Sequence, residues 1–124
     1  MKQYAIKSDR YAKDKVLGIL VYDEKKNAYT IDIPEDNTEK EVPIMLACFL
    51  KRGIRHIDEE WSMKWVQSRV VPPSRQNIGQ ILRVNNMKRY NEHDLLVKNQ
   101  GRCCQDECYI EEIIRKKQQN LTIL

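Results

Sequence analysis

Apolar and polar residues alternate near the N-terminus in a way that predicts a β-hairpin. Residues 16–22 (VLGILVY) are rich in β-branched and aromatic side chains, and residues 28–33 (AYTIDI) alternate in polarity before Pro34. The polar segment 23–27 between them is typical of a turn. Because an isolated hairpin is only marginally stable in water, we expect this one to pack on the rest of the chain.

The next apolar run carries the end signals of a helix. It follows an acidic loop over 34–41 and extends over residues 43–53. Pro43 suits the first helical position, and Gly53 suits the end of the helix. The run is so uniformly apolar that a buried strand over 43–52 is the alternative interpretation.

Four later segments show apolar residues at helical spacing. The first expected helix is capped by Asp58 and contains Trp61, Trp65 and Val66, and the second is capped by Ser74 and contains Ile78, Ile81 and Leu82. The third is capped by Asn91, contains Leu95 and Leu96 and ends near Gly101. The fourth is capped by Asp106 and contains Tyr109, Ile110, Ile113 and Ile114. In the last helix, Glu111–Arg115 and Glu112–Lys116 would form i,i+4 ion pairs. The sequence therefore predicts an α+β fold, with an N-terminal β-hairpin followed by a cluster of short α-helices.

Length and composition fit one small domain. The chain has 124 residues, of which 41% are hydrophobic and 32% charged. We expect a single domain over 1–117 and a frayed tail over 118–124. The chain shows neither a membrane-length apolar run nor a secretory leader, so we expect a cytoplasmic protein without a membrane partner. A complete kinase, Rossmann enzyme or barrel enzyme is excluded by size.

Charge is distributed unevenly along the chain. Residues 64–102 hold eight Lys and Arg against two Asp and Glu, whereas residues 23–41 hold three against seven. This polarity predicts a basic face that meets either an acidic protein or a nucleic acid, although a solvated surface without a partner has the same composition.

The cysteines and histidines do not form a recognisable catalytic or metal-binding motif. Cys103, Cys104 and Cys108 lack the C-x-x-C spacing of a zinc site, even with His93 beside them in sequence. Neither His56 nor His93 has an orienting partner in the sequence, and both are interpreted as surface histidines. Phosphate-binding glycine motifs are absent as well. We therefore expect reduced structural cysteines, no metal, no cofactor and no enzymatic activity.

Residues 75–98 resemble a basic helix-turn-helix in outline. Arg75, Arg83, Lys88 and Arg89 would then contact nucleic acid. The second helix, however, would begin with Glu92, His93 and Asp94, and carboxylates in that first turn would repel phosphates. A small basic DNA-binding regulator, or weak nonspecific contact with nucleic acid, is therefore the alternative function.

Trp61 and Trp65 lie one helical turn apart and invite two interpretations. Both could belong to the core, or one could be an exposed anchor for a protein partner, because Trp and Arg dominate interface hot spots. We assign the anchor to Trp65 and the core position to Trp61. Arg69, Arg75 and Arg102 are the basic residues expected to bind the same partner.

The order of several short motifs resembles the N-terminal subdomain of HipA-like toxin kinases. The segments that match are Val16–Leu20 for a V-G-x-L strand, Pro43–Leu50 for an apolar P-L-S-L-S-L-like run, Trp65–Arg75 for a helix, turn and arginine-bearing segment, His93–Leu96 for a D-L-L segment, and Gly101–Asp106 for a G-R-D-like motif. The likeness covers residues 16–106. Asp106 is displaced, Gly-Ala does not follow it, and the expected last helix stands where the family has a strand.

The resemblance implies a role without catalysis. The chain ends where the kinase core of the family would begin. In some operons this subdomain resembles a separate small protein that binds the kinase and holds it in check. The expected function is thus a non-enzymatic regulator that docks on a HipA-like kinase in a bacterial toxin–antitoxin or mobile-element system. The direction of regulation and the oligomeric state stay open.

Overall fold

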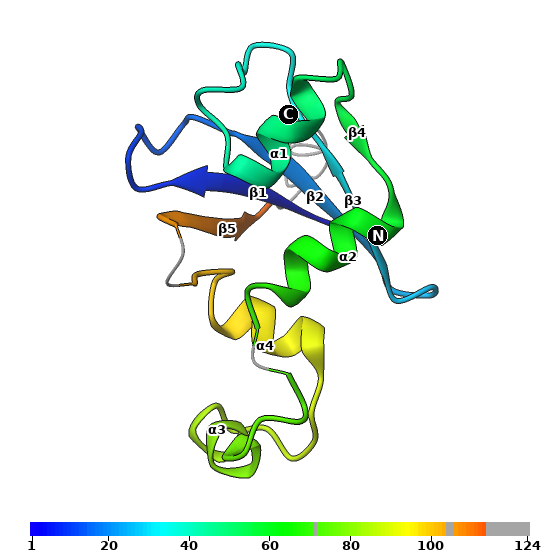
Figure 1. The fold of residues 1–124 in the computed structure, drawn as a ribbon. Helices are drawn as coiled ribbons and strands as arrows, with labels where there is room; N and C mark the ends of the chain where they lie inside the picture. The colour runs from blue at the N-terminus through cyan, green and yellow to red at the C-terminus, as the bar shows by residue number, and fades with distance from the viewer. Residues whose placement is uncertain (71, 104–105, 114–124) are drawn as a thin grey trace, which may run out of the picture.

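A five-stranded antiparallel sheet forms the centre of the molecule (Figure 1). The computed structural model describes residues 1–70, 72–103 and 106–113. The strands are β1 (Lys2–Ser8), β2 (Gly18–Asp23), β3 (Ala28–Asp32), β4 (His56–Ile57) and β5 (Cys108–Glu112), and they lie in the order β4-β3-β2-β1-β5. Four helices accompany the sheet in the described residues, so the predicted α+β class is confirmed.

The predicted hairpin is the pair β2 and β3. Its register runs from Ile19 opposite Asp32 to Asp23 opposite Ala28. Asn27 takes the left-handed backbone conformation, with φ of 53°, that a tight turn requires, and its side-chain oxygen accepts a hydrogen bond of 2.9 Å from the Tyr22 hydroxyl.

Three strands outside the hairpin were not predicted, namely β1, β5 and the two-residue β4. β1 pairs with β2 on one side and with β5 on the other, so Ile6 lies opposite both Gly18 and Ile110. The expected helix after Asp106 is therefore wrong: residues 108–112 form an edge strand. Tyr109, Ile110 and Ile113 also have the spacing of a helix, but here pairing with the free edge of β1 decides the structure, because it satisfies backbone hydrogen bonds of both strands. Ile114, Arg115, Lys116 and the predicted tail over 118–124 lie outside the described residues.

The apolar run after Pro43 is a helix, which decides between the two interpretations. This helix, α1, spans Ile44–Leu50. The turn that follows the helix closes at Gly53, whose φ of 76° is a conformation that commonly terminates helices and that residues with a Cβ seldom adopt. Leu46 and Phe49 are buried, whereas Ile44 is 84% exposed, so one side of the helix faces solvent.

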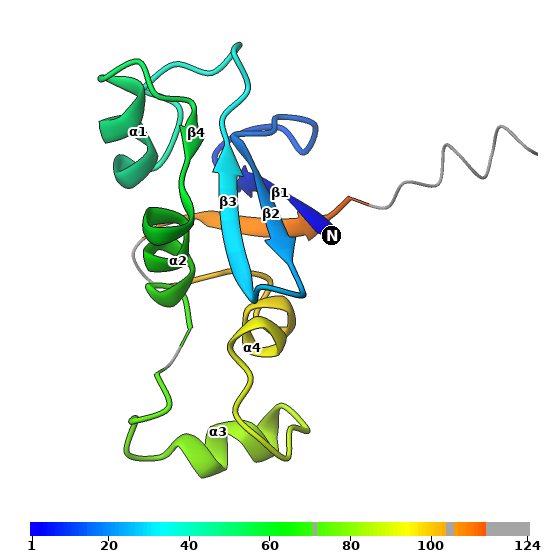
Figure 2. The same ribbon diagram turned by 90° about the vertical axis from the view of Figure 1, so that its right-hand side faces the viewer.

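The helix α2 (Glu59–Gln67) packs on the sheet on the same side as α1 (Figure 2). Its predicted cap is confirmed, because the Asp58 carboxylate accepts a hydrogen bond of 3.0 Å from the Trp61 amide. Trp65 and Val66 enter a core formed with residues of every layer. That core includes Ile6, Leu20, Ile31, Leu46 and Ile57, each at most 1% exposed.

The last two helices extend the molecule away from the sheet. The helix α4 (Glu92–Lys98) is capped by Asn91 as predicted and ends before Gly101. The helix α3 (Ile78–Val84) lies beyond α4 in both views (Figures 1 and 2). Its N-cap is Asn77, without a capping side-chain hydrogen bond, so the expectation of a Ser74 cap is wrong. None of its residues is buried.

Candidate functional site

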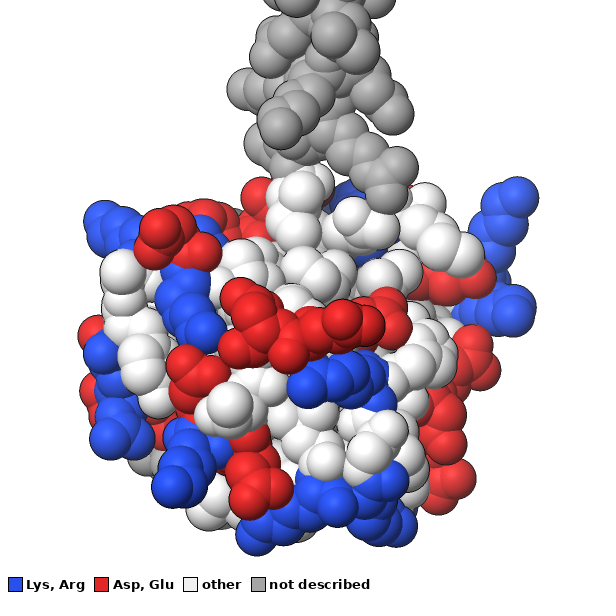
Figure 3. Space-filling view, turned by 90° about the horizontal axis from the view of Figure 1, so that it is seen from above, with Lys and Arg blue, Asp and Glu red and all other residues white. Residues whose placement is uncertain are grey.

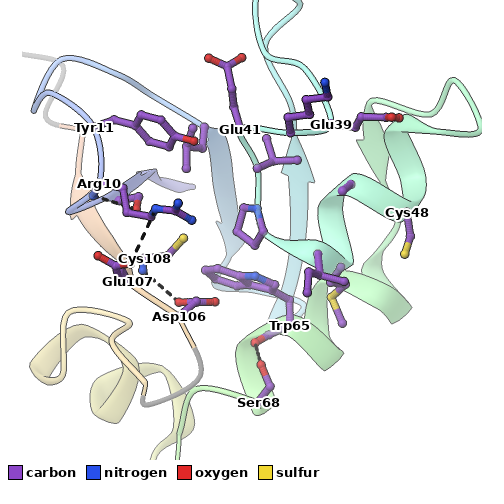
Figure 4. A pocket seen from close by; sticks show the side chains of 18 of the residues that line it. Arg10, Tyr11, Glu39, Glu41, Cys48, Trp65, Ser68, Asp106, Glu107 and Cys108 are labelled. Atoms are coloured by element: carbon purple, nitrogen blue, oxygen red, sulfur yellow. Dashed lines mark hydrogen bonds and ion pairs between the residues drawn. The ribbon is translucent and has the colours of Figure 1, made fainter.

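A cleft of about 740 Å³ opens between α1, the end of α2, the β1–β2 loop and the start of β5. Figure 4 shows the Trp65 indole at its floor, with Arg10 and Tyr11 on one side and Cys48 on the other. Further lining residues are Leu17, Val42, Pro43, Ile44, Met45, Ala47 and Cys108. Apolar side chains and polar or charged side chains line this concave surface in about equal numbers, so it offers both apolar contact area and hydrogen-bonding groups to a ligand.

Trp65 and Arg69 form the floor of this cleft as a rigid pair. The guanidinium carbon of Arg69 lies 4.3 Å from the centroid of the Trp65 ring. Asp106 accepts two hydrogen bonds from the same guanidinium, 2.5 Å from Nη2 and 3.2 Å from Nη1, and Cys103 Sγ lies 3.2 Å from Nη1. Charge pairing and stacking together hold the end of α2 against the segment that precedes β5.

The prediction that Trp65 is an exposed anchor is wrong. Its side chain is 2% exposed, and Arg69 is 4% exposed, so neither protrudes toward a partner. Helical spacing places Trp61 and Trp65 near one side of α2, but only the second of them reaches the sheet. Trp65 and Arg69 therefore form the buried floor of the cleft and support the exposed residues around it.

Trp61 is the exposed member of the pair, contrary to its predicted core position. Its side chain is 40% exposed and meets the Phe49 ring edge-on at 5.9 Å between centroids. Lys64 Nζ lies 4.1 Å from the Trp61 ring centroid. This tryptophan thus covers the outer side of α1 and α2, away from the residues that line the cleft.

Arg75 and Arg102, the other two predicted partner-binding residues, do not line the cleft. Arg75 is exposed in the segment before α3. Arg102 is exposed after α4, donates a hydrogen bond of 2.8 Å to Asp9 and lies 4.6 Å from the Tyr109 ring centroid. The structure therefore brings together only Trp65 and Arg69 of the four.

The rim of the cleft carries both acidic and basic side chains, and one exposed apolar side chain, Ile44. Lys40, Lys51 and Glu39 all line the cleft, and Glu41 pairs with Lys15 at 3.1 Å. Figure 3 looks down on this end of the molecule and shows acidic and basic side chains intermingled. Ile44 protrudes at the rim with 84% of its surface exposed. Sequence reasoning missed it because the uniformly apolar run did not reveal which side faces solvent.

His93 is buried, so its interpretation as a surface histidine is wrong. The Tyr4 hydroxyl lies 2.9 Å from Nε2, and the Tyr29 hydroxyl lies 2.9 Å from Nδ1. The Tyr22 ring stacks on the imidazole at 3.8 Å between centroids. Because one nitrogen of a neutral imidazole donates and the other accepts, one tyrosine hydroxyl accepts a hydrogen bond and the other donates one. This contact fastens α4 to the sheet.

Burial keeps the His93 cluster uncharged. Desolvation lowers the pKa of His93, and Lys2 lowers it further, against the opposing effect of Asp94, Glu24 and Glu112. Desolvation also raises the pKa of Tyr4 to about 12. Both effects favour the neutral forms that these hydrogen bonds use. Both imidazole nitrogens are engaged, so His93 is not placed to act as a base on a ligand in the cleft.

Two of the described cysteines, Cys103 and Cys108, lie near the Arg69 guanidinium, and Cys48 lies on α1. Cys48 is exposed on α1, Cys103 is half-buried, and Cys108 is buried. Desolvation raises the pKa of Cys108 to about 11, which keeps its thiol protonated and weakly nucleophilic at neutral pH. Among the residues that the structure describes, there is no group of three or more His, Cys, Asp or Glu placed to hold a metal ion. Cys104 lies outside the described residues.

The four residues predicted to bind nucleic acid lie on the segment around α3. Arg75, Arg83, Lys88 and Arg89 are all exposed. The second helix of the predicted helix-turn-helix is α4, and its first turn contains the buried His93. That turn faces the sheet, so α4 is not free to enter a DNA groove as a recognition helix.

The chain matches no protein-family model, no curated protein and no solved structure. No helix in the described part of the chain has the length and apolarity that a membrane span requires.

Proposed function

We propose that the protein is a non-enzymatic, cytoplasmic regulatory protein that docks on a HipA-like kinase of a bacterial toxin–antitoxin or mobile-element system. The cleft is its docking site, and an apolar segment of the kinase is the group that enters. This proposal combines the resemblance in the sequence with the surface that the fold builds from the same residues.

The observation that carries the proposal is the position of the motifs. Four of the five segments that resemble the kinase subdomain contribute to the lining of the cleft. The lining residues are Leu17 from the first, Pro43, Ile44, Met45, Ala47 and Cys48 from the second, Trp65, Ser68 and Arg69 from the third, and Asp106 from the last. Segments that are distant in sequence thus converge on one surface. The strand β5 also stands where the family has a strand, which removes one of the departures noted in the sequence.

The chemistry of the lining favours a polypeptide as the occupant. Tyr11, Ile44 and Met45 supply apolar surface next to the stacked pair of Trp65 and Arg69. Aromatic residues, Met and Arg are enriched in the cores of protein interfaces. Lysines and carboxylates alternate around the rim, which suits the polar margin of an interface and not a polyanion.

The buried and half-buried polar side chains at the floor of the cleft do not support catalysis. Cys108 has a protonated thiol, and Arg69 and Asp106 are paired with each other. A helix-turn-helix regulator is the weaker alternative because His93 fastens α4 to the sheet.

Co-expression with a HipA-like kinase encoded in the neighbouring reading frame tests the proposal. We expect the two chains to elute together in gel filtration as one complex, and the activity of the kinase to change when this protein is added. A kinase that elutes alone, or a neighbouring frame that encodes no such kinase, would contradict the proposal.

A further inference from the structure

The segment of residues 72–90, here called the basic arm, stands apart from the core. It contains α3 and lies beyond α4 at the end of the molecule opposite α1 (Figures 1 and 2). None of the α3 residues is buried, and Val84 is 77% exposed. Packing against the sheet therefore does not account for the composition of this arm.

The charged side chains of the basic arm are all cationic. Arg75, Arg83, Lys88 and Arg89 are exposed, and residues 72–90 contain no Asp or Glu. The arm also exposes hydrogen-bond donors on uncharged side chains, namely Ser74, Gln76, Asn77, Gln80 and Asn86. Arg, Lys, Ser, Asn and Gln are the side chains that contact phosphate oxygens in protein–DNA complexes.

Other polyanionic partners fit the arm less well. Tyr90 is the only aromatic residue in 72–90 and is half-buried, so the arm lacks the exposed rings on which single-stranded bases stack. The same lack disfavours a protein hot spot. Duplex RNA is recognised largely through its A-form shape and its 2′-hydroxyl groups, whereas duplex DNA can be bound through its phosphates alone.

We propose that the basic arm binds the phosphate backbone of duplex DNA. This contact differs from a helix-turn-helix, because α3 and its flanking segments make it while α4 stays fixed to the sheet by His93. It is independent of the kinase docking proposed for the cleft, and it uses a separate surface.

Fluorescence anisotropy with a labelled DNA duplex of about 20 base pairs tests this inference on the protein alone. If all four cations contact phosphates, the logarithm of affinity should fall with the logarithm of salt concentration with a slope of about −3 to −4. Affinity should then drop about a hundredfold between about 50 and 200 mM salt. Sequence changes in the duplex should have little effect.

A pair of matched double variants locates the contact. Arg83→Glu with Lys88→Glu should weaken binding at least about tenfold and reduce the salt slope by about two. Lys25→Glu with Lys26→Glu changes the net charge equally, but in the exposed β2–β3 turn, and should leave affinity within about threefold. All four residues are exposed, so circular dichroism should show both variants folded.

Three results would overturn the inference. The first is the absence of duplex binding by the unchanged protein at the lower salt concentration. The second is an equal loss in the two double variants, which would indicate an effect of net charge alone. The third is competition by polyglutamate or by single-stranded DNA that is as effective as competition by the duplex, which would indicate an acidic protein or a single strand as the partner.

Discussion

Arg69 and Asp106, 37 residues apart in sequence, form a two-point ion pair beneath the cleft. The side chain of Arg69 is 2% exposed and that of Asp106 is 30% exposed. Asp106 also accepts a hydrogen bond of 2.9 Å from the Cys108 amide, so the same carboxylate orients the start of β5. The ion pair therefore joins the end of α2 to the segment before β5, and the floor of the cleft lies between these two segments.

Replacement of Asp106 by Ala should destabilise the fold strongly. The substitution leaves the Arg69 guanidinium buried without a counter-charge, which typically costs about 3 kcal/mol or more. Chemical denaturation followed by circular dichroism measures this loss. Asp9→Ala is the control, because Asp9 and Arg102 make a similar two-point contact on the surface, and its loss should change stability little. Equal losses in the free energy of unfolding would show that the buried ion pair contributes no more to stability than the exposed one.

The two tryptophans should respond to truncation in opposite ways. Trp65→Ala removes a buried indole and the surface on which Arg69 stacks, so we expect a loss of about 3–5 kcal/mol in the free energy of unfolding. Trp61→Ala removes a side chain that is 40% exposed and should cost about 1 kcal/mol or less. Urea denaturation of both variants tests this. If Trp61→Ala proves the more destabilising, the placement of α2 on the sheet is wrong.

Stability should fall on mild acidification because of His93. Its pKa is lower in the folded protein than in the unfolded chain, where it is about 6.5, so the unfolded state binds more protons below that pH. The free energy of unfolding should therefore be constant for this group above about pH 7 and decrease as pH falls through about 6.5. Denaturation curves recorded at a series of pH values across this range measure how steeply the free energy of unfolding depends on pH. His93→Gln should flatten it, and an unchanged slope in that variant would assign the effect to other groups.

The parts of the fold that local patterns specify were predictable from the sequence. The hairpin, the caps at Asp58 and Asn91 and the turn at Gly53 that follows α1 each depend on residues within a few positions of one another. The strands β1, β4 and β5 were not predictable in this way. Each forms by pairing with a strand that is distant in sequence, and Tyr109, Ile110 and Ile113, in and just after β5, also fit a helical period.

The candidate site was predictable only in part, for a similar reason. Trp65 and Arg69 were both named as partner-binding residues, but neither their contact nor their burial was predicted, because both depend on which side of α2 meets the sheet. The two hydrogen-bond partners of His93, Tyr4 and Tyr29, are far away in sequence, so no local pattern predicts them. Ile44 was hidden within an apolar run whose exposed side only the packing of Leu46 and Phe49 defines.

Calorimetric titration of the kinase partner with two matched variants tests the docking proposal most directly. Ile44 and Val84 are 84% and 77% exposed, but only Ile44 lines the cleft. Ile44→Asp should leave the fold intact and reduce the affinity for the kinase by at least about 2 kcal/mol, the size of a hot-spot loss. Val84→Asp should leave that affinity unchanged. Full affinity of the Ile44→Asp protein, or an equal loss in both variants, would contradict the assignment of the cleft as the docking site.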